Sequence, residues 1–128
     1  MRAFVVLVAL FASMVQVAAQ DAALEALRLE DAGDPARAEQ VLRAAASRQD
    51  AGPATLEAYA GFLERHGNPG ARAAYERLLG ALEGQDQRAR RAGVARKLVL
   101  LALEAGDRAA AVRHLQQYRE FGGAGWAE

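Results

Sequence analysis

The chain has 128 residues, of which 52% are hydrophobic and 25% charged, enough for one domain rather than two. Its 16 basic and 16 acidic side chains cancel, which argues against binding nucleic acid or an anionic membrane through bulk charge. The lack of cysteine excludes disulfides, thiolate nucleophiles and cysteine-ligated metals. Alanine fills 32 positions and isoleucine none, and this composition favours helix over strand.

Residues 1–19 have the pattern of a cleaved signal peptide. Arg2 supplies a short positive start, residues 3–14 form an apolar run, and the small residues before Gln20 suit signal peptidase. The run is shorter than the roughly 20 apolar residues of a membrane span. We therefore expect an exported chain, periplasmic or secreted, that begins at Gln20 and has no stable membrane span after cleavage. An uncleaved anchor and a buried core helix are the alternatives for this segment.

Beyond Gln20 the apolar spacing predicts three pairs of helices. The first pair is expected at residues 22–32 and 35–48, the second at 54–66 and 69–82, and the third at 87–105 and 108–121. In the last helix, the apolar stripe should be formed by Ala109, Val112 and Leu115. Aromatic side chains should fill the larger gaps between helices, namely Tyr59, Phe62, Tyr75, Tyr118 and Phe121.

One local signal occurs at the middle of every predicted pair: a glycine, then Asp or Asn, then a residue that opens a helix. The three copies are Gly33-Asp34-Pro35, Gly67-Asn68-Pro69 and Gly106-Asp107-Arg108. Glycine ends a helix in the left-handed conformation, and Asp or Asn caps the next helix through its side-chain oxygen. Proline at the first helical position removes no intrahelical hydrogen bond. Each copy therefore predicts a tight corner between two helices.

The corner glycines recur at intervals of 34 and 39 residues. The third pair has the clearest packing pattern, with Leu98, Val99 and Ala102 before its corner and Ala111, Leu115 and Tyr118 after it. In period and in these small and large positions, residues 21–121 resemble the tetratricopeptide repeat family. The resemblance implies an all-α fold, a right-handed α-solenoid of about three helical hairpins forming one domain over residues 20–121. Related helical-pair repeats and a plain helical bundle are the alternatives.

No helix is predicted after residue 121, although a helical stack normally ends in a polar capping helix. We expect residues 122–128 to be a flexible tail or the start of a missing cap, with Trp126 folding back on the last pair. An uncapped last helix could pair with a second copy, which would form a homodimer, or with a further domain.

No set of residues in the sequence predicts catalysis, a metal or a cofactor. His66 suits the C-terminal end of its helix, and His114 has no second histidine or carboxylate at metal-binding spacing. Ser47 lacks the glycines of a nucleophile elbow. A basic cluster is interpreted either as a solvated helix start or as a dock for an acidic peptide, and it consists of Arg88, Arg90, Arg91, Arg96 and Lys97.

The family resemblance implies a concave groove lined by the first helix of each pair. The groove positions in this sequence are Glu30, Glu57, Glu64, Arg65, Arg96, Leu100, Leu103 and Glu104. The early positions are mostly acidic, whereas Leu100 and Leu103 form an apolar patch that suits a peptide with apolar anchors. We predict a non-enzymatic scaffold that binds a protein or peptide and no nucleic acid. The alternative is a structural or oligomerising piece, or an accessory domain of a larger protein.

Overall fold

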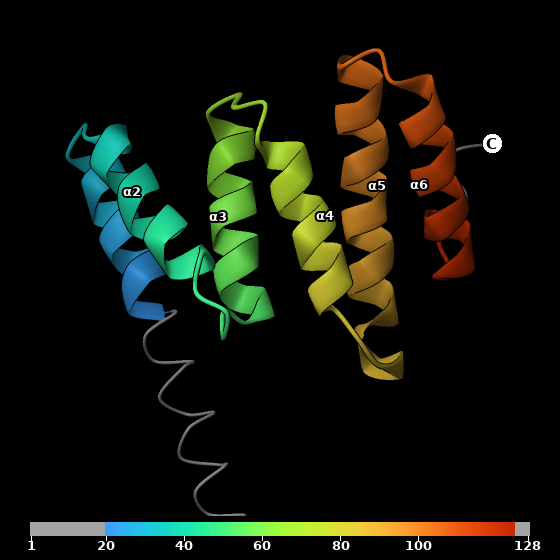
Figure 1. Ribbon diagram of the computed structural model, residues 1–128, viewed down its shortest axis with the longest axis horizontal. Coiled ribbons are helices and arrows are strands. Elements are labelled where there is room, and N and C mark those ends of the chain that lie inside the picture. The colour runs from blue at the N-terminus through green and yellow to red at the C-terminus, as the bar shows by residue number, and fades with distance from the viewer. Residues whose placement is uncertain (1–19, 125–128) are drawn as a thin grey trace, which may run out of the picture. The chain divides into compact units, whose positions relative to one another are not determined.

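The computed structural model describes residues 20–124, and all regular structure in this range is helical (Figure 1). Residues 20–31 are helical. They are followed by α2 (Pro35–Ala46), α3 (Pro53–Arg65), α4 (Ala71–Ala81), the short 3-10 helix η1 (Gln85–Gln87), α5 (Arg88–Glu104) and α6 (Arg108–Glu120). The all-α prediction is therefore confirmed. The predicted signal peptide and Trp126 lie outside the described residues.

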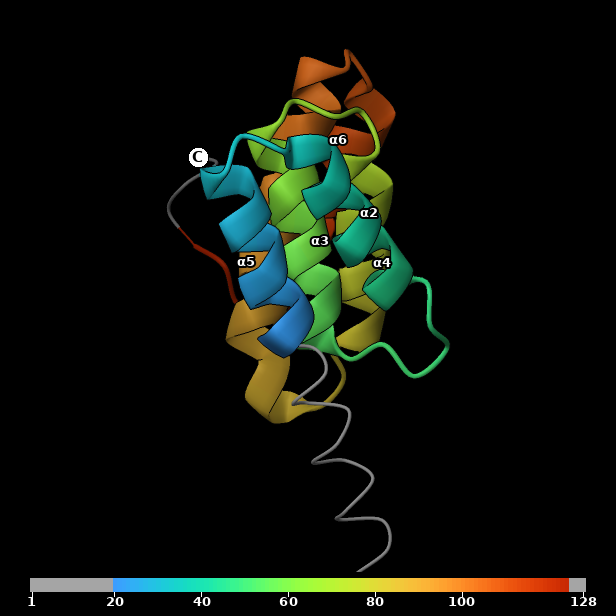
Figure 2. The same ribbon diagram turned by 90° about the vertical axis from the view of Figure 1, so that its left-hand side faces the viewer.

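The chain divides into two compact units between His66 and Gly67. In the first unit, the helix at residues 20–31 and α2 form a hairpin that packs on α3, and Figure 2 shows both helices in front of α3. Its core is rich in alanine, which lets helices approach closely, and comprises Ala26, Ala38, Leu42, Ala46, Leu56, Ala60, Phe62 and Leu63. Between residues 20 and 124, no helix is long and apolar enough to span a bilayer.

In the second unit, α5 packs against both α4 and α6. Leu78, Leu82 and Leu98 are its largest fully buried side chains. The α5–α6 hairpin closes over two small clusters, one formed by Val99, Ala102, Ala110 and Ala111 and the other by Ala92, Ala95 and Tyr118. Leu115 is half-buried and packs against both clusters.

The corners at Gly33 and Gly106 form as the sequence predicts. Both glycines have positive φ, +79° and +72°. The residue after each glycine donates its N–H to a carbonyl five positions earlier, at 2.8 Å in both corners, which is the bond that closes a helix C-terminus. The carboxylates of Asp34 and Asp107 then cap α2 and α6.

The middle corner differs, because α4 begins at Ala71 rather than at residue 69. Asn68 Oδ1 accepts from the N–H of Gly70 at 2.8 Å, only two residues on. This bond closes a turn before the helix, so the first two predicted helical residues belong to that turn. From residue 31 onward, the other predicted helix limits lie within two residues of the described ones.

The predicted apolar stripe of the last helix is wrong at Ala109 and Val112 but right at Leu115, and the packing positions predicted after the third corner, Ala111, Leu115 and Tyr118, lie on the packed face. Ala109 is exposed and Val112 is 57% exposed, whereas the buried side chains of α6 are Ala110, Ala111, His114 and Tyr118. The packed face is therefore turned by about one residue along α6 from the predicted one. This rotation of the packed face buries His114 and leaves Val112 at the surface.

Candidate functional site

The predicted groove residues of the first unit do not form an open acidic surface. Glu30, at the end of the first helix, binds the C-terminal end of α3: its Oε2 lies 3.0 Å from Arg65 Nη2 and its Oε1 lies 2.8 Å from His66 Nε2. His66 also stacks on Phe62, with ring centroids 4.3 Å apart. Burial alone would raise the pKa of Glu30, but the hydrogen bond with His66 and the charge of Arg65 outweigh it and lower that pKa. Glu30 and Arg65 thus join two helices.

The other two predicted groove residues of this unit lie on α3. Glu57 is exposed and Glu64 is half-buried. The structure therefore places four of the eight predicted groove residues in the first unit, and two of those four bind each other.

The four groove residues of the second unit share one face of α5. Arg96, Leu100 and Glu104 are four apart, and Leu103 follows Leu100 by three; both spacings place side chains on the same face of a helix. All four are exposed, with 44% of Leu100 and 54% of Leu103 accessible to solvent. The result is a short apolar stripe on α5 with a cation at one end and an anion at the other. We call these four residues the α5 stripe.

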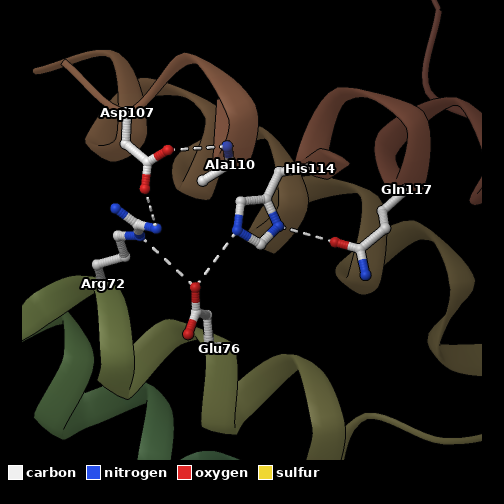
Figure 3. A network of polar contacts seen from close by, with 6 residues as sticks. All are labelled: Arg72, Glu76, Asp107, Ala110, His114 and Gln117. Carbon is white, nitrogen blue, oxygen red and sulfur yellow. Dashed lines mark hydrogen bonds and ion pairs between the residues drawn. The ribbon is translucent and has the colours of Figure 1, made fainter. Parts of the chain in front are cut away.

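A polar network that the sequence did not predict joins α4 to α6 (Figure 3). Arg72 Nη2 lies 2.7 Å from Asp107 Oδ2, and Arg72 Nε lies 3.6 Å from Glu76 Oε1. The same Glu76 oxygen is 3.4 Å from His114 Nε2, an ion-pair distance without hydrogen-bond geometry. On its other side, His114 Nδ1 is 2.8 Å from Gln117 Oε1. The pKa of Asp107 is lowered first by the Ala110 N–H and then by Arg72.

The network joins two helices around a buried histidine. The His114 side chain is only 4% exposed, and the carboxylates of Glu76 and Asp107 are both shared with Arg72. No group of three or more His, Cys, Asp or Glu side chains within residues 20–124 could hold a metal ion. The sequence predicts no carboxylate at metal-binding spacing from His114 along its own helix, and the nearby carboxylate of Glu76 comes from α4.

The predicted basic cluster separates into differently placed side chains. Arg90 Nη1 donates to Gln87 Oε1 at 3.1 Å, and Lys97 Nζ lies 5.4 Å from the centre of the Tyr75 ring. The guanidinium of Arg91 lies 4.2 Å above the ring of Phe121. Together with Arg88, it lines a pocket of about 380 Å³ whose other walls are Gly84, Gln85, Glu120 and Phe121. We call this the Arg88–Arg91 pocket.

No protein-family model, curated protein or solved structure matches the chain.

Within the described chain, the hydroxyl of Ser47 donates to the carbonyl of Arg43 at 2.7 Å, as expected for a residue that ends α2. Among the described residues of the second unit, the α5 stripe and the Arg88–Arg91 pocket both present side chains that a ligand could contact.

Proposed function

We propose that this chain is a non-enzymatic, exported interaction module that binds an apolar segment of a protein partner on the α5 stripe. The exposure of Leu100 and Leu103 is the observation that carries the proposal. Their neighbours Leu98, Val99 and Ala102 are buried, so α5 has a well-packed inner face and a separate apolar outer one. Burying a leucine is worth about 1.5–3 kcal/mol, and the unit leaves two of them at its surface.

The polar ends of the α5 stripe favour a binding role for these leucines. Single exposed apolar residues are ordinary. Here, two lie one turn apart, and Arg96 and Glu104 lie at the two ends of the stripe. An apolar centre with a charged rim is the usual composition of a protein interface. The partner we propose is a helical or extended segment whose apolar residues are three or four apart and whose ends carry complementary charge.

The repeat pattern supports the same surface. In a right-handed array of three tetratricopeptide-like hairpins, α5 is the first helix of the third pair and would line the concave groove. The signal-like pattern of residues 1–19 supports export. The concave groove and export both belong to the proposed function.

The binding surface is tested by selecting a displayed peptide library on residues 20–128. We expect enriched peptides to bind the wild type and to lose at least about tenfold in affinity on a Leu100→Asp/Leu103→Asp double variant. Val112→Asp is the control, because it places one such charge on a similarly exposed apolar site of α6. Unchanged far-UV circular dichroism would show that both variants fold. A selection that enriches nothing, or peptides that bind the double variant as well as the wild type, would contradict the proposal.

Export is tested by fusing residues 1–24 to a reporter enzyme that is active only outside the cytoplasm. An active reporter, and a mature N-terminus at Gln20 found by N-terminal sequencing, are the expected results. An inactive reporter would remove export from the proposal and leave the binding surface unaffected.

Self-association through α6 is the second candidate, and the 57% exposure of Val112 favours it. Light scattering of residues 20–128 over a range of concentrations should then show a dimer that Val112→Asp converts to a monomer. A monomer at every concentration would exclude this candidate and leave the α5 stripe as the proposed surface.

A further inference from the structure

The Arg88–Arg91 pocket lies where α5 begins and α6 ends. Arg88 is the first residue of α5, and its Nη2 donates to the main-chain carbonyl of Glu120, the last residue of α6. This bond holds the exposed Arg88 guanidinium against the C-terminal end of α6. The N-terminal end of α5 adds the partial positive charge of its helix dipole to the same place.

Arg91 has no acidic partner in the described part of the chain. Its recorded contact is with the face of Phe121, at 4.2 Å. Its Nε is buried and has no hydrogen-bond partner between residues 20 and 124. An unpaired buried donor is costly, and such groups in native structures call for an explanation. A guanidinium that stacks by its face keeps the N–H groups at its edge for an acceptor in its own plane.

The one acidic side chain of the pocket does not neutralise these arginines. Glu120 lines the pocket, but Arg88 binds its main-chain carbonyl, and the structure records no ion pair of the Glu120 carboxylate among the described residues. The lining thus combines two guanidinium groups, one carboxylate and an aromatic ring. Its volume, about 380 Å³, lies within the range of small-molecule sites.

We propose that the Arg88–Arg91 pocket binds an oxyanion, a carboxylate or phosphate group carried on a flat apolar body. The two oxygens of such a group match the forked donors of a guanidinium, and Arg91 and Arg88 supply two of these forks. Phe121 supplies the apolar wall beside the charge. The pocket shares no residue with the α5 stripe, so a result against one site does not count against the other.

The probes for this site are sodium benzoate, phenyl phosphate and inorganic phosphate, each titrated into residues 20–128 at constant ionic strength. Amide resonances followed by NMR should shift mainly within residues 84–91 and 118–123. Tighter binding of benzoate would identify a carboxylate ligand, and tighter binding of phenyl phosphate a phosphate ester; either result supports the site. Binding of all three probes weaker than about 10 mM, or shifts spread over every arginine of the chain, would overturn it.

Three variants distinguish a specific anion-binding site from non-specific electrostatic attraction of the probe to the protein. Arg91→Gln should weaken binding of the tighter probe by at least about tenfold. Glu120→Gln should tighten binding of the same probe several-fold, because it removes a negative charge that repels the anionic probe. Arg108→Gln removes the same charge at the opposite end of α6 and should change nothing. Equal weakening by Arg91→Gln and Arg108→Gln would overturn the proposal.

Arg91→Lys guards against loss of folding in the glutamine variant. Lysine keeps a cation over Phe121 but lacks the forked donors, so the fold should persist while binding weakens. Wild-type affinity in Arg91→Lys, together with no gain in Glu120→Gln, would show that neither side chain faces the ligand.

Discussion

The corners at Gly33-Asp34 and Gly106-Asp107 have the same local structure and different tertiary roles. In both, the aspartate Oδ1 accepts a main-chain N–H at the start of the next helix, at 3.1 Å from Arg37 and at 3.0 Å from Ala110. The second oxygen of Asp34 reaches only Arg37 of the same turn, at 3.9 Å. The second oxygen of Asp107 accepts instead from Arg72 of α4 at 2.7 Å. A local signal therefore predicts the corner but not whether the rest of its unit depends on it.

The two histidines show the same contrast. His66 ends α3 with 39% of its side chain exposed, and it shares Glu30 with Arg65. His114 lies within α6, is 4% exposed, and is close to Glu76. In each unit, an arginine also pairs with an acid 35 positions away, Arg65 with Glu30 and Arg72 with Asp107. The two arginine–acid pairs are both partly exposed, so the contrast lies in the histidines: His66 is at the surface, whereas His114 belongs to the packed face of α6.

The largest effect should come from the core of the second unit. Leu98→Ala should lower the free energy of unfolding by about 2–5 kcal/mol, because Leu98 is fully buried. Leu115→Ala should fall in the lower half of that range, since Leu115 is only half-buried. Urea denaturation of residues 20–128 measures both. A loss below about 0.5 kcal/mol for Leu115→Ala, the level of a surface change, would show that α6 does not pack through this residue.

The histidine contrast predicts the next largest difference. His114→Gln should cost about 1–3 kcal/mol, because it disturbs a buried polar group whose partners Glu76 and Gln117 come from two helices. His66→Gln should cost less than about 1 kcal/mol, since Glu30 keeps Arg65. The same denaturation experiment compares them. Equal losses would mean that burial does not distinguish the two histidines.

The corner contrast predicts a smaller and more specific effect. Asp34→Asn and Asp107→Asn both keep a side-chain oxygen that can cap a helix. Only Asp107→Asn removes the charge that pairs with Arg72, so it alone should lower the melting temperature clearly. Thermal unfolding followed by circular dichroism measures the difference. The pairing would have no energetic role if the two variants melted together.

The smallest effect is the pH dependence of the Glu30 pairs. The pKa of Glu30 is lowered from its ordinary value of 4.5, so its ionised form is stabilised by folding. This stability is complete above pH 4.5 and is lost as the pH falls through the lowered folded value. Glu30→Gln should therefore destabilise the chain at pH 7 and converge with the wild type in acid. Urea midpoints measured from pH 7 downwards test this, and a constant difference at every pH would contradict it.

The local signals along the chain were sufficient for the helices and two of the corners. Glycine at a helix end and aspartate at the start of the next helix act within five residues, so their effect can be predicted from the sequence without knowledge of packing. At the middle corner Gly67 has the predicted positive φ, +61°, but Asn68 bonds two residues on rather than three, so the next helix begins later than predicted. On α6, the predicted packing of Ala111, Leu115 and Tyr118 is confirmed, whereas Val112 is exposed and His114 buried. Hydrophobicity alone favours Val112 over His114 on an inner face, and the partner Glu76 on another helix reverses that preference.

The amino-acid sequence by itself determined that this protein is helical, where its helices turn, and that cysteine chemistry plays no part in it. These properties depend on composition or on neighbours a few residues apart. Only the tertiary structure decided that Glu30 binds Arg65 and His66, that His114 is buried, and that Arg91 lies over Phe121 beside a pocket. Each of these depends on which faces of separate helices meet, and packing settles that through side chains far apart in the sequence.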